Sequence, residues 1–412
     1  MSSHLATLRP RAGRAGLLGA ALLGLVMMLP AAADASHTKK GVNVKLMTRN
    51  IFLGADLGPA LAASNTNEFI EANGEILREV DQTDFPRRAG ILADEILSKK
   101  PDLVGLQEVA LWRTAPPNVT PALTNTPTAT TVEYDFLQLL LDELNDGLYD
   151  EGSDEYEEGA YEVVVVQEEF DFEAPADENN VDGDGPNAFI PNAEINGRLT
   201  MRDVILRRVG SNVKTKNETG GNFENELVVR VANVVNVPVT RGWTQLDATA
   251  KKKIKKGKHK GKSVKKKFRF VNSHFEAFDD ETERPSIRAR QADELIQKAA
   301  NDDRSIILGD FNSDSPGVKP GDEQAYEVLQ SGGLDQPYVT GFRTLADHPG
   351  SCCVPDLFTP SPSEFDHQVD HVMTNMPKQK AKRLKSGVTG LTQVGGMYGS
   401  DHGGVWSRVK LK

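Results

Sequence analysis

The stretch Ser305-Ile-Ile-Leu-Gly-Asp310-Phe-Asn312-Ser is an apolar segment that ends in a carboxylate and a carboxamide two residues apart. Residues i and i+2 of a strand share a face, which would place the polar groups of Asp310 and Asn312 in one cleft at the strand's carboxyl edge. Taken alone, Gly, Asp and Asn in succession are more typical of a turn. The segments that resemble it elsewhere in the chain favour the cleft.

Polar side chains stand at the ends of other strand-like runs as well. Pro101 to Val109 carries a carboxylate after its apolar run, and Lys45 to Asn50 ends in a carboxamide. A carboxylate at such an edge is a suitable ligand for a hard cation such as Mg²⁺. Each segment alone is a weak signal, but together they suggest one shared site. The residues concerned are Asn50, Glu108, His274, Asp370, Asp401 and His402.

Strand-like and helix-like patterns alternate along the chain. Many strands with few helices between them favour stacked sheets with helices on the outside. The 412 residues, 38% of them hydrophobic, fit a globular protein. The patterns predict strands at 43–47, 103–106, 161–167, 203–208, 227–235, 268–273, 305–308, 369–373 and 404–410, and helices at 85–97, 134–145, 284–300 and 322–330.

The first 35 residues have the pattern of an export signal. Arginines 9, 11 and 14 precede an apolar stretch from Ala15 to Pro30, and small residues follow up to Ala35. Cleavage is expected after Ala35 or Ala33, giving a secreted protein without a membrane-spanning segment. Losing three Arg and one Asp would change the formal net charge from -11 to -13.

Three stretches interrupt the pattern of strands and helices and are expected to be insertions in a single domain spanning 41–412. Residues 115–131 are rich in Pro, Thr and Asn, which predicts a loop, and the acidic stretch 142–186 predicts solvated loops around one strand. Lys251 to Lys267 contains eleven lysines in seventeen residues and has the glycines of a hairpin or tongue. This lysine-rich tongue is either a solvated loop or a contact for a polyanion or an anionic membrane surface.

The chain has two cysteines, the adjacent Cys352 and Cys353. In an oxidising compartment they would form a bridge with each other or pair between chains, and two cysteines cannot build a disulfide scaffold. The stability of the fold must therefore come from its core.

The order and content of these segments, above all Gly-Asp310-Phe-Asn312 and Ser-Asp401-His402-Gly, resemble the endonuclease/exonuclease/phosphatase superfamily of metal-dependent phosphoesterases. Deoxyribonuclease I-like nucleases and bacterial sphingomyelinases belong to it. The resemblance implies an α/β (α+β) four-layer sandwich, in which two mixed β-sheets pack face to face and helices cover both outer faces. It places the active site at one edge of the sandwich.

The resemblance also implies roles for these residues. Glu108, Asn50 and Asp401 would hold Mg²⁺, with Mn²⁺ or Ca²⁺ as alternatives, and Asp310 would orient or deprotonate the attacking water. Asn312 would donate hydrogen bonds to the phosphorane. His402, oriented by Asp370, would contact the phosphate, and His274 would be a second phosphate contact or the general acid. Arg198 and Arg202 precede a strand where the family often places a phosphate-binding group.

The substrate is left open between several phosphoesters. A secreted monomeric nuclease would use the lysine-rich tongue as an electrostatic clamp. A sphingomyelinase or phospholipase C would need an exposed apolar loop, for which 188–191 and 355–358 are candidates. The third alternative is a surface protein that binds anionic polymers without catalysis, which predicts the loss of at least one catalytic position, and none is lost.

Overall fold

The computed structural model describes residues 41–146, 160–187, 189–255, 260–279, 282–318 and 322–412. Lys40–Lys412 form one compact unit. The export signal predicted for residues 1–35 lies outside the described residues. In the part of the chain that is described, no helix combines the length and the apolar character needed to cross a membrane.

The larger sheet is mixed, because β1 runs parallel to β2 and antiparallel to β16. Its strand order is β15-β16-β1-β2-β6-β3-β4, and β5 also pairs with β6. The bounds are β1 Val42–Asn50, β2 Leu103–Gln107, β3 Leu111–Ala115, β4 Thr131–Asp135, β5 Tyr161–Ala176, β6 Ile195–Arg208, β15 Ala381–Thr389 and β16 Gly404–Leu411.

The smaller sheet is mixed as well and has the order β13-β14-β12-β11-β10-β7, with β11 parallel to β12. Its strands are β7 Val213–Asn222, β10 Gly242–Lys253, β11 Ser263–His274, β12 Ser305–Asp310, β13 Arg343–Thr344 and β14 Asp370–Thr374.

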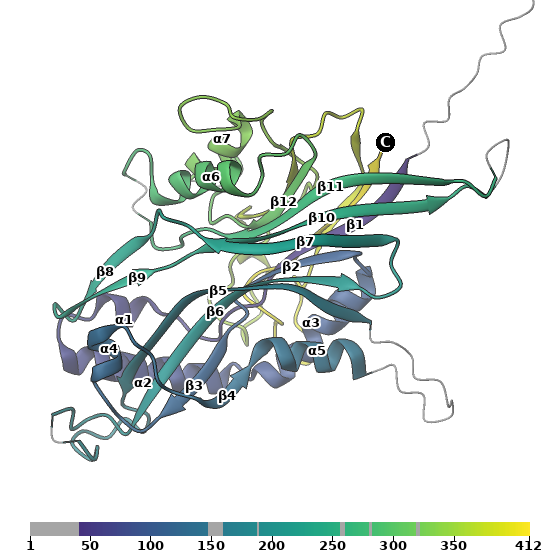
Figure 1. Cartoon of the computed structure of the whole chain (residues 1–412). Coiled ribbons are helices and arrows are strands. Elements are labelled where there is room, and N and C mark those ends of the chain that lie inside the picture. Colours follow the sequence, from purple (N-terminus) through teal and green to yellow (C-terminus); the bar gives the residue numbers. More distant parts are fainter. Residues whose placement is uncertain (1–40, 147–159, 188, 256–259, 280–281, 319–321) are drawn as a thin grey trace, which may run out of the picture. The chain divides into compact units, whose positions relative to one another are not determined.

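The two sheets face each other, and helices lie on their outer sides (Figure 1). Alternating side chains of the strands divide the hydrophobic core into layers. Phe270 and Leu308 pack with Leu46 and Ile205 between the two sheets. Their neighbours in sequence, such as Val271, pack outward against helices of the smaller sheet. The helices are α6 Ile287–Lys298 and α7 Gln324–Ser331 on that side, α2 Thr66–Gln82, α3 Phe85–Lys99 and α5 Phe136–Asp146 on the larger sheet, and the short α1 Gly58–Ala62 and α4 Thr120–Thr124. The predicted four-layer sandwich is confirmed.

Some predicted elements differ from those observed. The single strand predicted at 227–235 is a hairpin of β8 Leu227–Val231 and β9 Val235–Val239, because Ala232 and Asn233 take left-handed backbone conformations. Helix α2 was not predicted. In the acidic stretch 142–186, β5 is much longer than the predicted strand and follows β6 over most of its length.

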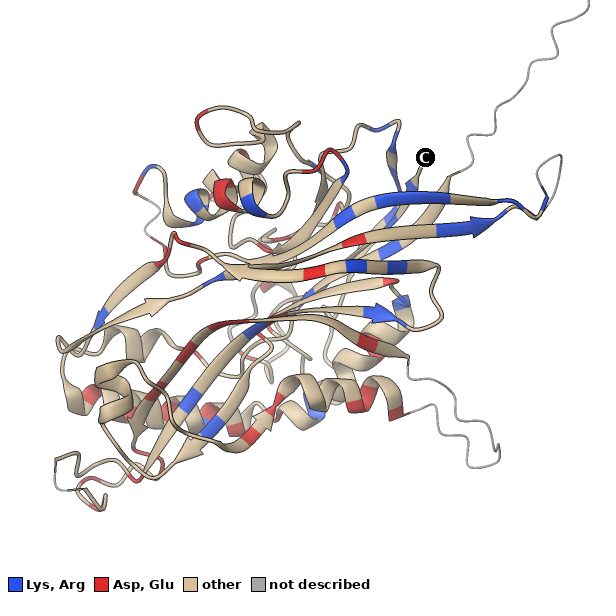
Figure 2. Cartoon of the chain, viewed as in Figure 1, with Lys and Arg blue, Asp and Glu red and all other residues tan. Residues whose placement is uncertain are grey.

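The described residues of the lysine-rich tongue continue the β10–β11 hairpin, whose pairing extends to Lys253 opposite Ser263. Figure 2 shows basic residues along the ends of β7, β10 and β11. Strand alternation and register place some of them on one face of the sheet, which we call the lysine face. The lysine face lies at the end of β11 that is farther from His274. The stretch of strand from Lys265 to His274 spans about 30 Å. The exposed residues of this face are Lys214, Lys216, Lys251, Lys253, Lys265 and Lys267.

Candidate active site

The strand register brings the predicted site residues to one edge of the sandwich. His274 pairs with Asp310 across β11 and β12, and Asp310 pairs with Asp370 across β12 and β14. In the facing sheet, Asn50 pairs with Gln107, and Glu108 follows directly. Because these strands end at the same level, their terminal side chains converge.

The backbone around Asp310 is shaped to present its carboxylate. Gly309 has φ +155°, and a Cβ there would overlap Ser273 O of the neighbouring strand, so only glycine fits. After the strand, Asn312 takes φ 45°, and its backbone N–H donates to Asp310 Oδ1 at 2.9 Å. Glu108 also has positive φ, at 56°. Non-glycine residues in this conformation concentrate at functional sites.

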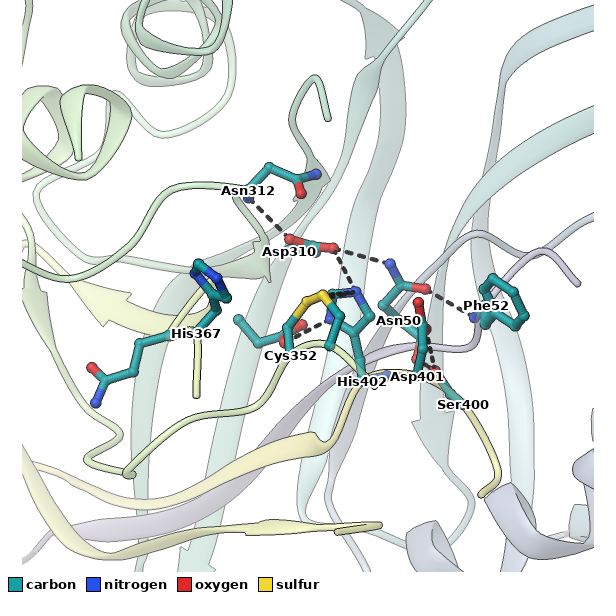
Figure 3. The surroundings of a disulfide bond; sticks show 12 residues. Asn50, Phe52, Asp310, Asn312, Cys352, His367, Ser400, Asp401 and His402 are labelled. Atoms are coloured by element: carbon teal, nitrogen blue, oxygen red, sulfur yellow. Dashed lines mark hydrogen bonds and ion pairs between the residues drawn. A yellow bond between two sulfur atoms is a disulfide. The ribbon is translucent and has the colours of Figure 1, made fainter. Parts of the chain in front are cut away.

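Asp310 is at the centre of the cluster (Figure 3). Its Oδ2 accepts a hydrogen bond from Asn50 Nδ2 at 3.0 Å and lies 3.5 Å from His402 Nε2. Burial raises the pKa of Asp310 to about 7, with the nearby Asp370 adding to the shift and His402 opposing it. A carboxylate whose pKa lies near neutrality is suited to accept a proton.

Asn50 connects Asp310 to Glu108. Its Nδ2 also donates to Glu108 Oε1 at 2.9 Å, while its Oδ1 accepts from the backbone N–H of Phe52. Glu108 Oε2 accepts from Leu53 N at 2.8 Å. The amide of Asn50 thus orients two carboxylates.

Glu108 and Asp401 both line a cleft of about 930 Å³. Burial raises the pKa of Asp401 to about 6, and the charge of Glu108 adds to this effect. Carboxylate oxygens are the donors that a hard divalent cation prefers. Ligand atoms of Glu108, His274 and Asp310 also lie within 4.8 Å of one another.

His402 and Asp370 form a carboxylate–imidazole pair, with 2.9 Å between His402 Nδ1 and Asp370 Oδ2. Burial lowers the pKa of His402, but Asp370, Asp310 and Asp401 together raise it well above its ordinary value. His402 is therefore a buried cation whose Nε2 points toward Asp310.

His274 has the opposite electrostatic environment. Burial lowers its pKa well below the ordinary value, and the charges of Arg241 and His402 lower it further. Arg241 Nη1 lies 3.2 Å from Nδ1, and because guanidinium groups only donate, Nδ1 is the acceptor. On the other side of the ring, Nε2 lies 3.1 Å from Asn312 Nδ2 and 3.7 Å from Asp310 Oδ2.

Arg198 and Arg202 are not brought to this cluster. Arg198 is paired with Asp171 of β5, at 2.8 Å and 2.6 Å. Arg202 donates to the backbone oxygens of Val109 and Ala110 and to Asp135. Both guanidinium groups are thus engaged in tying strands and loops together, and neither lines the cleft.

Arg241 is a cationic residue at the site that the sequence reasoning missed. It is buried, lines the cleft and stays charged, because Glu276 and Glu169 raise its pKa against the effect of burial. It lies between β9 and β10, where a lone arginine gives no sequence signal. Glu169 and Asp203 were missed too; burial raises the pKa of Glu169 to about 8 and that of Asp203 well above its ordinary value.

The walls of the cleft are acidic and partly apolar. Phe278 and Phe358 line it and are 40% and 45% exposed. The walls carry few cationic side chains. Apart from the position of the phosphate, they therefore do not complement the negative charge of a polyanion. Its charged lining residues are Asp56, Glu75, Glu79, Glu108, Asp356 and Asp401 with Arg78 and Arg241.

Comparison with known proteins gives one family. The model of the Endonuclease/Exonuclease/phosphatase family matches residues 63–402. No curated protein matches the chain.

Solved structures with a similar fold have low sequence identity. An endonuclease/exonuclease/phosphatase family protein from Bacteroides thetaiotaomicron is 13% identical, with 90% of this chain and 99% of that chain covered and a TM-score of 0.46. D. rerio TDP2 complexed with single strand DNA product is 14% identical, with 89% and 98% covered and a TM-score of 0.42. The mannosyl-6-phosphatase Bt3783 of Bacteroides thetaiotaomicron is 14% identical, with 89% and 99% covered and a TM-score of 0.45.

Proposed function

The chain belongs to the endonuclease/exonuclease/phosphatase family, and from that premise we propose that it is a secreted, divalent-metal-dependent phosphodiesterase. Members of the family are hydrolases that act on phosphoester bonds. In this proposal residues 1–35 direct export and residues 41–412 form a single catalytic domain. The observation that carries it is the position of Asp310, 3.0 Å from Asn50 and 3.5 Å from His402 beside the carboxylates of the cleft.

The residues at the cleft fit a hard divalent cation. Glu108 and Asp401 would hold Mg²⁺, or Mn²⁺ or Ca²⁺, through carboxylate oxygens, and Asn50 would orient Glu108. When bound, the cation supplies charge neutralisation at the phosphate and the oxygen that departs from it.

Asp310 is the proposed general base. Its pKa of about 7 lets it accept a proton from water near neutral pH. The Asn50 amide and the backbone N–H of Asn312 hold the carboxylate in one orientation while its charge changes. The water is thereby positioned for in-line attack on phosphorus.

His402 and His274 are the proposed phosphate contacts, one charged and one neutral. Charged His402 would neutralise a phosphate oxygen, and Asp370 keeps it protonated. His274 would be a second contact to a phosphate oxygen or the acid at the departing oxygen, and Asn312, whose Nδ2 lies 3.1 Å from His274 Nε2, would donate to the pentavalent phosphorane.

Nucleic acid is the first candidate substrate, and the observation that favours it is the lysine face. Because that face lies about 30 Å from the site, it would hold only a polymer long enough to reach both places. A lipid phosphodiester such as sphingomyelin is the second candidate. It is favoured by exposed Phe278 and Phe358 at the cleft, which would touch a bilayer surface.

A substrate panel tests the proposal. The purified protein is assayed on plasmid DNA, RNA, sphingomyelin vesicles and bis-p-nitrophenyl phosphate, each with Mg²⁺ and with a chelator. The proposal expects hydrolysis of at least the small diester that stops in the chelator. Binding of DNA without hydrolysis of any substrate would instead support a non-catalytic binder of anionic polymers.

A further inference from the structure

The disulfide between Cys352 and Cys353 lies directly against His402 (Figure 3). Cys352 Sγ is 3.5 Å and Cys353 Sγ is 3.8 Å from His402 Nε2. These are the only cysteines of the chain, and neither has a part in the proposed hydrolysis. Cys352 is buried and Cys353 is exposed, so the pair is open to reagents from solvent.

Backbone hydrogen bonds on both sides hold the two cysteines at His402. Val354 N donates to Asp401 O at 3.1 Å, and Gly403 N donates to Ser351 O at 2.6 Å. The bond between the sulfurs is therefore not what places them beside the ring. Both thiols would stay within reach of Nε2 after the disulfide is reduced.

The separations between His402 Nε2 and the two sulfurs match those of a tetrahedral zinc site, and reduction would free the sulfurs to move apart. Zn–S bonds of about 2.3 Å and Zn–N bonds of about 2.0–2.1 Å at tetrahedral angles place S and N ligands about 3.6 Å apart. The separations of Cys352 Sγ and Cys353 Sγ from His402 Nε2, 3.5 Å and 3.8 Å, lie on either side of this expected distance. Ligand atoms of Cys352, Cys353 and His402 all lie within 4.8 Å of one another.

Cys352, Cys353 and His402 supply three ligands of such a site, and a solvent oxygen would complete the tetrahedron. Asp310 Oδ2 lies 3.5 Å from His402 Nε2, so the ion would be bound beside the catalytic carboxylate.

We propose that reduction of the Cys352–Cys353 disulfide creates an inhibitory site for one Zn²⁺-class ion, bound by both thiolates and His402 Nε2. In the oxidised protein the sulfurs are bonded to each other and offer no thiolate, so the site is closed. The site is distinct from the Mg²⁺ position at Glu108 and Asp401, because it uses soft sulfur ligands.

A phosphine can serve as the reductant of the Cys352–Cys353 disulfide. The phosphine gives two electrons to the disulfide and takes an oxygen atom from water, becoming a phosphine oxide. The two hydrogens of that water end on the sulfurs as two thiols. Zn²⁺ then displaces both thiol protons, and the Nε2 proton of His402, to solvent.

Inhibition is the part of this inference that rests on the proposed function. An ion on His402 Nε2 would occupy the group proposed to contact the phosphate, and it would lie beside Asp310, which is proposed to activate water. Binding of the ion does not depend on that role. The two are therefore measured separately.

The binding experiment counts zinc on the full protein in saturating Mg²⁺. Oxidised and phosphine-reduced samples are incubated with Zn²⁺, freed of excess metal by gel filtration and analysed for zinc. Reduction is expected to add one zinc per chain to the wild type and none to Cys352→Ser/Cys353→Ser. Replacing Zn²⁺ by Cd²⁺ should give the ultraviolet charge-transfer band of a thiolate complex. Equal zinc in the oxidised and reduced wild type, or the same gain in the double variant, would overturn the proposal.

The activity experiment follows hydrolysis of bis-p-nitrophenyl phosphate in the same samples. Zn²⁺ is expected to lower the rate of the reduced wild type by about tenfold or more, reversibly with a zinc-selective chelator, relative to the same sample without zinc. The double variant, compared with itself, should respond equally before and after reduction. If zinc binds and the rate does not fall, the metal site is supported. The proposed catalytic roles of His402 and Asp310 are then contradicted.

Discussion

Arg241 Nη1 lies 3.2 Å from Nδ1 of His274, so this imidazole faces a cation, whereas His402 faces the carboxylate of Asp370 at 2.9 Å. The two histidines of the site are thereby held in different protonation states. His274 is neutral, and His402 is a cation.

Replacing Arg241 by glutamine is expected to raise the pKa of His274, because the charge of Arg241 lowers that pKa in addition to burial. The measurement is an NMR titration of the histidine ring nitrogens. Arg202→Gln is the matched control, since Arg202 is also buried but donates to Val109 O and Ala110 O. An equal shift of His274 in both variants, or no shift in either, would contradict the role of Arg241.

Replacing Asp370 by asparagine removes the largest of the charges that raise the pKa of His402. The variant should lose its His402 proton at lower pH, which moves the alkaline limb of the kcat/KM profile to lower pH. The rate itself should fall by about 10²–10⁴-fold. Asp314→Asn is the control, because Asp314 pairs with His367, 2.7 Å from His367 Nδ1. An alkaline limb that stays in place in Asp370→Asn would refute the pairing as the source of the charge.

Replacing Glu108 by glutamine should raise the Mg²⁺ concentration that gives half-maximal activity by about 10–100-fold or more, because a carboxylate ligand is lost. Glu79→Gln changes another glutamate of the same cleft, one that accepts from Asp56 N. A titration of activity with Mg²⁺ compares the two. Equal responses would mean that the cation does not bind at Glu108.

Charge reversal on the lysine face should weaken binding of long DNA. Lys251 and Lys265 are directly opposite each other, and Lys251→Glu/Lys265→Glu is expected to reduce the slope of log affinity against log salt by about 2. Lys382→Glu/Lys385→Glu makes the same charge change on the exposed β15 and should leave the slope unchanged. Hydrolysis of a small diester should be the same in both variants. A slope equal to that of the wild type would leave the lysine face without a role in binding nucleic acid.

Much of the site could be predicted from the ends of the strands. An apolar strand such as β12 has no packing reason to end in Gly-Asp310-Phe-Asn312, and the same holds for Glu108 after β2. Once several such ends are assumed to share a sheet edge, their convergence follows from strand pairing, as the His274–Asp310 register shows. The four-layer fold came from the resemblance and is confirmed.

The contacts that depend on cross-strand register could not be predicted. Arg198 was expected at the phosphate, but it lies opposite Glu173 of β5 and pairs with Asp171. Arg241 lies in a segment whose sequence has no polar periodicity. It reaches the site because β10 and β11 are antiparallel, which places the neighbouring Gly242 opposite His274. Single-residue patterns carry no information about such long-range neighbours.

The most direct test of the proposed mechanism is the pH dependence of bis-p-nitrophenyl phosphate hydrolysis by the wild type and Asp310→Asn in saturating Mg²⁺. The pKa of Asp310 is raised to about 7, so the base is ionised above that pH and protonated below it. The wild-type rate should therefore fall as pH decreases through the neutral range. Asp310→Asn should be slower by about 10²–10⁴-fold and lack that limb. A variant with the wild-type rate and the same acid limb would contradict the assignment of Asp310 as the base that activates water.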